Sequence, residues 1–233
     1  MDLLPGMTDM HTHLLPGVDD GIRSVTDSVE ALTCLQRLGV ERIYLTPHVM
    51  EDLPGNTPEA LYARYRELVS ACPPGLELRL AAEYMLDAGF ARLTGKGLLT
   101  LSDRHVLVET PYLFYFPDLE HILYGLVLSG YIPIIAHPER YVYMEDTHYF
   151  QLKERGCELQ LNLFSLAGLY GEHIRKRAFF VLKEGLYDYT GSDIHQLKTY
   201  TEFLKRLRLD RSQRKELERL IANNTTLWNR ENR

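Results

Sequence analysis

Seven short apolar runs, each reaching a polar side chain at or near its end, constrain the fold of this chain most. They are rich in β-branched, aromatic or leucine residues, which is typical of β-strands. Because their bodies are largely apolar, we expect burial on both faces, as in a parallel sheet. The runs read "MTDMHTH", "ERIYLTPH", "LELRLAAEY", "RHVLVET", "YIPIIAHPER", "CELQLNL" and "GLYDYTGSDIH".

Helical patterns separate these runs. Residues 24–38 place apolar side chains at helical spacing, begin with Ser24 as a candidate N-cap and stop before Gly39. A second helix start is indicated by Thr57, which is followed by a proline in the first turn. We expect helices at 24–38, 57–70, 117–129, 146–155 and 172–184, and a longer charged helix or helix pair at 198–222.

The alternation of strands and helices indicates one α/β domain. Successive run ends lie 25–37 residues apart, which leaves room for one strand, one helix and their loops. We therefore expect a single domain over residues 1–233, with a short lead at 1–7 and a charged helical region at 198–233. In a barrel of parallel strands, side chains at the carboxyl ends meet at one mouth, where active sites form.

Charge and composition exclude several classes of protein. The net charge is −6, so no global basic field predicts nucleic-acid binding. The sequence contains no run of 18 apolar residues, so no membrane span is expected, and the N-terminus does not resemble a signal peptide. Cys34, Cys72 and Cys157 share no metal or redox spacing, which favours reduced thiols. We expect a cytoplasmic protein.

The polar residues at the strand ends form a metal-binding set of five histidines and four carboxylates. Imidazole and carboxylate together suit Zn, Mn, Fe or Co, and the lack of cysteine argues against a purely structural zinc site. Nine candidates are too many for one ion, so we expect two or three, with Glu83 or Asp193 as a bridge. The candidates are His11, His13, Asp20, His48, Glu83, Glu109, His137, Asp193 and His195.

Charge at this set favours an anionic substrate. Four carboxylates without metal would repel one another, whereas three divalent cations would leave a net positive site. Arg140 follows His137 by three residues, and its planar guanidinium fits a phosphate.

The same residues carry a resemblance to a known family. The motifs "DMHTHLLPGVDDG", "TPH", "AAEY", "LVET", "AHPERY" and "GSDIH" occur in order across residues 9–195. With them the sequence resembles the PHP (polymerase and histidinol phosphatase) superfamily, in particular its bacterial capsule and exopolysaccharide protein-tyrosine phosphatases. The resemblance implies a distorted seven-stranded (β/α) TIM-like barrel and a three-metal site, commonly of manganese.

The resemblance also implies a role for each motif residue. Arg140 would bind the phosphate, while the inventory of residues itself offers Asp20 or His48 to assist the leaving phenolate. The first ion would be held by His11, His13, Glu83 and Asp193. The second would be held by Glu83, Glu109 and His137. The third would be held by Asp20, His48 and His195.

The implied function is metal-dependent hydrolysis of phosphotyrosine, by a metal-activated hydroxide, on a bacterial tyrosine kinase that governs polysaccharide export. Two alternatives stay open: a histidinol phosphatase or other small-molecule phosphoesterase, and an inactive metal-binding interaction module. In the segment 111–118, Tyr112 or Phe114 would flank the phosphotyrosine ring, unless the segment only packs over the barrel.

Three further features have plain structural interpretations. Asp19 is expected to be a turn residue, with Gly21 supplying backbone freedom. Asp9 either orients a metal-bound histidine or supports its own strand. Residues 204–220 mix charges of both signs, which predicts a solvated helix face.

Overall fold

Within the residues that the structure describes, nine parallel strands in two sheets form the centre of the fold. The computed structural model describes residues 6–93 and 97–230. In the smaller sheet the strand order is β1 (Met7–Asp9), β2 (Val40–Leu45) and β4 (Glu77–Leu80). In the larger sheet the order is β3 (His48–Val49), β5 (Glu83–Met85), β6 (His105–Glu109), β7 (Ile132–Ala136), β8 (Glu158–Asn162) and β9 (Tyr189–Gly191).

The strand count differs from the expected seven because two of the predicted strands are interrupted. The run ending at His48 is split at Thr46 and Pro47, and the run reaching Glu83 is split at the two alanines before it. Pro47 has no N–H to donate to a neighbouring strand, although its carbonyl accepts from Glu83 N at 3.0 Å. A single seven-stranded barrel is therefore not confirmed, and no barrel is closed among the described residues.

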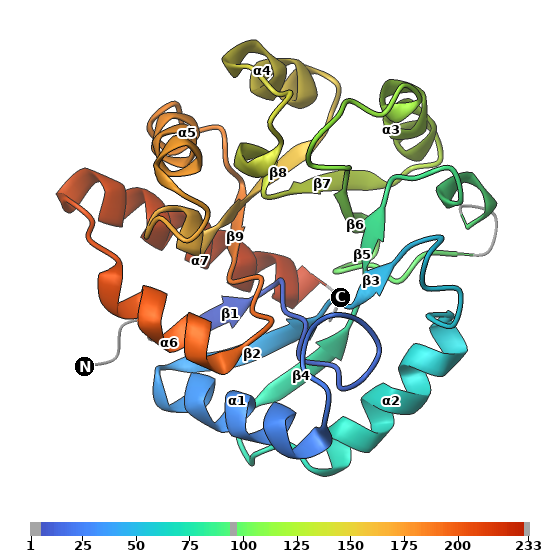
Figure 1. Ribbon diagram of the computed structural model, residues 1–233, viewed down its shortest axis with the longest axis vertical. Coiled ribbons are helices and arrows are strands. Elements are labelled where there is room, and N and C mark those ends of the chain that lie inside the picture. The colour runs from blue at the N-terminus through green and yellow to red at the C-terminus, as the bar shows by residue number, and fades with distance from the viewer. Residues whose placement is uncertain (1–5, 94–96, 231–233) are drawn as a thin grey trace.

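The two sheets adjoin at the carboxyl ends of their first and last strands. Asp193 N donates to His11 O at 2.8 Å, and His13 N donates to Ile194 O at 3.0 Å. Figure 1 shows the strands arranged around a common centre, with the earlier helices outside them and the last, C-terminal helix running toward the centre. The carboxyl ends of strands that are far apart in sequence consequently surround one site.

Seven α-helices in the described part of the chain pack against the strands, and the predicted starts of the first two are confirmed. Ser24 Oγ accepts from Asp27 N at 3.1 Å, and Thr57 caps the second helix in the same way. The expected 198–222 segment is a helix pair whose second member ends later than predicted. The helices are α1 (Val25–Arg37), α2 (Pro58–Ser70), α3 (Leu119–Leu128), α4 (Asp146–Glu154), α5 (Glu172–Lys183), α6 (Leu197–Arg206) and α7 (Arg211–Arg230).

The end of α7 packs into the space enclosed by the strands. Leu227 and Trp228 are buried in one cluster with inward-facing residues of the strands, such as Met10, Tyr44 and Ile134. The Trp228 ring meets the Tyr44 ring edge-on, with centroids 4.7 Å apart. A larger apolar cluster lies between the strands and the surrounding helices. The helix α7 is therefore part of the core, although only a solvated face is predicted for residues 204–220.

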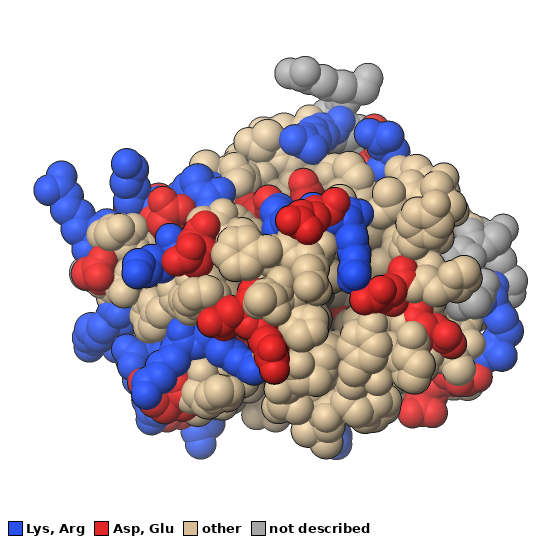
Figure 2. All heavy atoms as spheres, turned by 90° about the horizontal axis from the view of Figure 1, so that it is seen from above, with Lys and Arg blue, Asp and Glu red and all other residues tan. Residues whose placement is uncertain are grey.

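The surface has mixed charge. On the face shown in Figure 2, Lys and Arg side chains are interspersed with Asp and Glu side chains. Within the part of the chain that the structure describes, no helix combines the length and the apolar character needed to cross a bilayer. The three cysteines are free thiols.

Candidate metal centre

All nine predicted ligands lie at the carboxyl side of the strands. His11 and His13 follow β1, Glu109 ends β6, and His137 follows β7. His48 and Glu83 occupy paired positions at the start of β3 and β5, beyond the two interruptions. Asp193 and His195 follow β9, and Asp20 lies in the loop after β1. Six of the nine are buried, whereas His48 and His195 are half-buried and Asp20 is exposed.

Four ligand atoms converge at the centre of the site. The Nε2 atoms of His11 and His13 lie 3.1 Å apart, as expected if both rings face one point. Glu83 Oε2 lies 3.1 Å from His11 Nε2 and 3.3 Å from His13 Nε2. Asp193 Oδ1 lies 3.4 Å and 3.2 Å from the same two nitrogens. Ligands of one ion, each about 2.0–2.2 Å from it, have this spacing.

A second group surrounds Glu83 on its other side. His48 Nδ1 lies 3.3 Å from Glu83 Oε2 and 3.0 Å from Glu109 Oε1. His137 Nε2 lies 3.0 Å from Glu83 Oε1 and 4.0 Å from Asp193 Oδ2. Both carboxylate oxygens of Glu83 therefore face imidazoles, and this residue is placed to contact more than one ion.

The outermost group is formed around Asp20. Its Oδ1 lies 3.5 Å from His48 Nε2 and 3.3 Å from His195 Nε2. His13 joins this group, since potential ligand atoms of the four residues all lie within 4.8 Å of one another. The expected third set of Asp20, His48 and His195 is thus brought together with one additional histidine.

One grouping differs from the division that the resemblance implies. His48 lies with Glu83 and Glu109 in a set of potential ligand atoms within 4.8 Å of one another. A second such set contains His11, Glu83, His137 and Asp193. The structure thus places His48 in the position beside Glu109 that was expected for His137.

The buried carboxylates and imidazoles compensate each other's charge. Burial alone would raise the pKa of Glu83, but the neighbouring imidazoles outweigh it and hold that pKa well below its usual range. The pKa of Asp193 is lowered well below its usual range for the same reason. Burial alone would lower the pKa of His48, but Asp20, Glu109 and Glu83 raise it to about 10.

Two buried atoms of the site lack hydrogen bonds, and this supports the fit of a metal. Glu83 Oε2 and His48 Nδ1 are buried without a partner of hydrogen-bonding geometry, although ring nitrogens surround the oxygen. A buried polar atom without a partner is costly. A divalent cation would supply the missing contact, and the mixed N and O donor set suits Mn, Fe, Zn or Co.

Two residues outside the predicted set orient the central histidines. Gln160 Oε1 lies 2.7 Å from His11 Nδ1, and Asp19 Oδ2 lies 2.9 Å from His13 Nδ1. An acceptor at Nδ1 keeps the proton there and leaves Nε2 free to bind a metal. Gln160 was missed, although it alternates with Asn162 as a polar position within an apolar strand.

Asp19 combines this contact with the expected turn. Its Oδ1 accepts from Gly21 N at 2.9 Å, as a turn residue does, and its Oδ2 also accepts from His48 N at 3.1 Å. Asp9 instead accepts from the backbone of His11 and Ser192. Of the two roles predicted for Asp9, support of the strand is the one these contacts match.

Two ligand candidates have backbones in the left-handed region. The φ angles are 35° at His137 and 52° at Asp193, where a non-glycine residue is strained. Such strain costs about 1–3 kcal/mol and persists where surrounding structure fixes the residue. His137 directly follows β7 and Asp193 is the second residue after β9, so these backbone angles lie where each side chain turns into the site.

Arg140 lies between two tyrosine rings at the edge of the centre. Its guanidinium carbon is 4.5 Å from the centre of the Tyr112 ring and 4.1 Å from that of Tyr170, and Nη1 donates to Asp193 Oδ2 at 2.7 Å. Tyr112 also donates to Glu109 Oε2 at 3.0 Å. Phe114, by contrast, is 59% exposed. Tyr170 was missed because it follows a loop rather than a strand.

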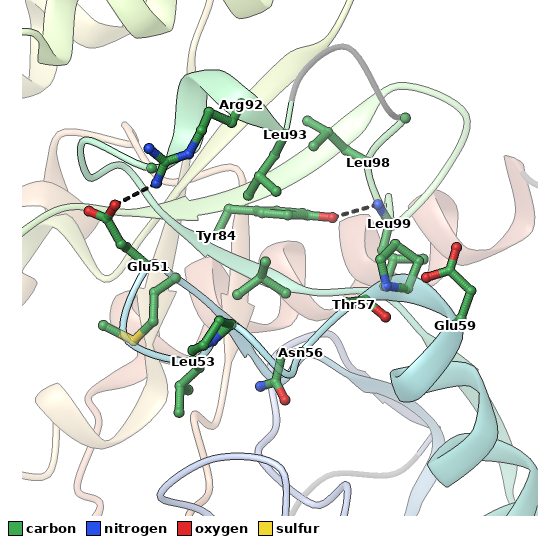
Figure 3. A pocket seen from close by; sticks show the side chains of 16 residues that line it. Glu51, Leu53, Asn56, Thr57, Glu59, Tyr84, Arg92, Leu93, Leu98 and Leu99 are labelled. Atoms are coloured by element: carbon green, nitrogen blue, oxygen red, sulfur yellow. Dashed lines mark hydrogen bonds and ion pairs between the residues drawn. The ribbon is translucent and has the colours of Figure 1, made fainter.

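Two cavities lie near the centre. The larger, of about 490 Å³, is on the opposite side of β5: Glu83 faces the metal centre, and the next residue, Tyr84, lines the cavity. Figure 3 shows the Tyr84 hydroxyl pointing toward Leu99, with the Glu51–Arg92 ion pair on the opposite side of Tyr84. The smaller cavity, of about 300 Å³, borders Arg140, Asp193 and His195 directly.

Comparison with known proteins identifies relatives over nearly the whole chain. YwqE, a tyrosine-protein phosphatase of Bacillus subtilis, is 32% identical over 205 residues, which cover 83% of this chain and 79% of YwqE. CpsB, a tyrosine-protein phosphatase of Streptococcus pneumoniae, is 30% identical over 213 residues, covering 85% and 87% of the two chains.

A solved structure agrees with this relationship. It comes from work on YwqE and S. pneumoniae CpsB that describes them as metal-dependent tyrosine phosphatases. It superposes with a TM-score of 0.76 at 26% identity, covering 97% of this chain and 95% of the other. The family model for capsular polysaccharide synthesis proteins of the CpsB/CapC type matches residues 7–225. The chain therefore belongs to the CpsB/CapC family.

Proposed function

We propose that this protein is a metal-dependent protein-tyrosine phosphatase. The observation that carries the proposal is the convergence of five histidines and four carboxylates beside Arg140, in a chain of the CpsB/CapC family. A phosphate ester needs cationic groups around its oxygens, and this site offers a guanidinium and a set of metal ligands in contact with it.

The nine residues at the strand ends would hold two or three divalent ions, manganese first among the candidates. Glu83 is placed to contact more than one of them, because its two oxygens face the imidazoles of His48 and His137 on different sides. His11, His13, Glu83 and Asp193 would hold a central ion, and Asp20, His48 and His195, with His13 within reach, would hold an outer one. Such ions would lower the pKa of bound water and neutralise charge at the attacking and leaving oxygens.

The chain's own residues bind and orient the phosphate. Arg140 donates two parallel N–H groups to the equatorial oxygens, and the Tyr112 and Tyr170 rings keep the guanidinium plane fixed between them. Gln160 and Asp19 hold the central imidazoles in one tautomer. Phe114, exposed at the rim, contacts the substrate peptide beyond the phosphorylated residue.

Asp20 or His48 assists departure of the phenolate. Asp20 is the exposed carboxylate of the site, and its Oδ1 lies 3.5 Å from His48 Nε2. A phenolate leaves readily, so this assistance is a smaller part of the rate than the electrostatic stabilisation.

The substrate we propose is a phosphotyrosine protein in the cytoplasm, namely a bacterial tyrosine kinase of polysaccharide export. The family's role in capsular polysaccharide synthesis and the tyrosine phosphatase activity named for its relatives support this choice. The alternative histidinol phosphatase would use the same ions on a small substrate. An inactive interaction module is disfavoured, because all nine ligand positions are filled by side chains that bind metal.

A turnover panel tests the proposal. Purified protein with Mn²⁺ is assayed for phosphate release from a phosphotyrosine peptide, a phosphoserine peptide and histidinol phosphate, before and after chelation. We expect release from the phosphotyrosine peptide above the other two, and loss of that release on chelation. Activity that survives removal of metal would contradict the mechanism, and preference for histidinol phosphate would contradict the substrate class.

A further inference from the structure

A cavity of about 300 Å³ opens directly beside Arg140. Its lining includes Arg140, Asp193 and His195 of the site, and also Leu169, Ile194 and Thr199. It lies between the loop that follows η4 (Leu163–Ser165) and the first turn of α6. Small-molecule sites have this size and this combination of an apolar wall with a few polar groups.

The lining of the cavity combines two kinds of chemistry. The Arg140 guanidinium offers N–H donors beside the candidate metal ligands Asp193 and His195. Leu169 and Ile194 offer apolar surface, and the Tyr170 ring lines the cavity as well. A ligand that matches both has an anionic head and a flat apolar body.

The lining distinguishes between two classes of phosphate ester. Among the lining residues that the structure describes, Asp193 is the only carboxylate, and it already contacts Arg140 Nη1 at 2.7 Å. A cationic amino alcohol would bury its ammonium here without an anionic partner, which is unfavourable. An uncharged aromatic ring would instead replace water against Leu169 and Ile194 and gain apolar contact.

We propose that this cavity is the subsite for the aryl ring of the substrate, so that the metal centre selects aryl over alkyl phosphates. The inference rests on the proposed phosphatase function and deepens it. The phosphoryl group lies beside Arg140, and the ring lies along Leu169 and Thr199. Tyr112 lies on the other side of Arg140, and neither it nor Phe114 lines this cavity.

Binding of two phosphonates that are not hydrolysed tests the subsite without turnover. Benzylphosphonate and methylphosphonate share the anionic head, and only the first carries a ring. With the Mn²⁺-loaded protein in a calorimeter, we expect benzylphosphonate to bind about tenfold more tightly or better. In Thr199→Phe, whose new ring fills the cavity, this preference should vanish while methylphosphonate affinity stays within about twofold.

A matched variant and a second wall control the experiment. Thr201→Phe introduces the same ring on the same helix at a position that does not line the cavity, and it should keep the wild-type preference. Leu169→Ala removes part of the opposite wall and should reduce the preference at least about threefold. This variant keeps the subsite testable if Thr199→Phe fails to fold.

Three results would overturn the subsite. In the first, the wild type binds both phosphonates equally well. In the second, Thr199→Phe and Leu169→Ala both keep the preference for benzylphosphonate. In the third, Phe114→Ala loses that preference while the two cavity variants keep it. Failure of the proposed function looks different: no phosphate is released from phosphotyrosine although the aryl preference and its loss in Thr199→Phe are both observed. Turnover of phosphotyrosine without any aryl preference would leave the function standing and remove the subsite.

Discussion

At the scale of single residues, the site depends most on Glu83. Its carboxylate lies within 3.3 Å of nitrogens from four histidines, and its side chain is completely buried. The imidazoles around it replace the water that a carboxylate normally requires. No other carboxylate of the described chain has so many imidazole neighbours at this distance, so loss of its charge affects every part of the site.

Replacement of Glu83 by glutamine should empty the centre of metal. The amide keeps the shape but loses the charge and offers one weaker ligand atom, so we expect metal content to fall and turnover to drop by at least about 100-fold. Elemental analysis and phosphotyrosine turnover measure both. Glu77→Gln, at the outer end of the same sequence run, is the matched control and should leave both unchanged. Full metal content in Glu83→Gln would contradict the bridging role.

Replacement of Gln160 by leucine should weaken metal binding without removing a ligand. His11 then loses the acceptor at Nδ1, so the tautomer with a free Nε2 is no longer favoured. We expect a loss of about 10–100-fold in Mn²⁺ affinity, measured by competition with a chelating dye. Gln151→Leu, exposed on α4, serves as the control. An unchanged affinity would show that His11 is oriented by other contacts.

Among the elements, α7 contributes most beyond what the sequence indicates. It begins as a charged, exposed helix, but its last two turns bury Asn224, Leu227 and Trp228. Asn224 Nδ2 donates to Thr8 O at 2.8 Å and to Thr190 O at 2.7 Å, and so joins β1 and β9. The Arg79 guanidinium lies 3.9 Å above the Trp228 ring.

Truncation of Trp228 should destabilise the whole fold. In Trp228→Ala the space inside the strands loses its largest side chain, and a cavity of this kind costs about 3–5 kcal/mol. Urea denaturation followed by circular dichroism gives the free energy of unfolding. Asn229→Ala, on the exposed side of the same turn, should change it by less than about 0.5 kcal/mol. Similar stability of the two variants would mean that α7 is peripheral.

Much of this site can be predicted from sequence, because polar residues at the ends of apolar strands are buried only where a partner compensates for the lost water. His11, His48 and Glu109 are costly to bury unless something pairs with them. The strand interruption at Pro47 follows from the missing backbone N–H of proline. Whether the interruption divides the strands into two sheets, however, depends on strands from distant segments of the chain. Tyr170 and Trp228 carry no local signal, since loops and charged helices place such residues on the surface more often than inside.

For the molecule as a whole, protonation and metal binding are linked. Without metal, carboxylates raise the pKa of His48 to about 10 from 6.5, so its ring is charged at pH 7. A metal must displace that proton, and metal affinity should therefore rise with pH across this range. The stabilisation that the charged ring gives the metal-free protein is fully present below pH 6.5 and is lost as the pH rises through 10.

Proton release on metal binding measures this linkage. Titration of metal-free protein with Mn²⁺ at pH 7, in buffers of different ionisation enthalpy, should show release of about one proton or more per protein. The melting temperature should also rise on addition of Mn²⁺, because the ions bind the folded chain. Buffer-independent heats would contradict the charged state of the metal-free centre.

The position of α7 has a consequence for synthesis on the ribosome. Every ligand from His11 to His195 emerges before the helix that joins the first and last strands through Asn224. A nascent chain that has not yet reached α7 holds a full set of ligands around an interior that Trp228 has not filled. The ligand residues therefore reach their final arrangement only after α7 has folded onto the strands, although all of them precede it in the chain.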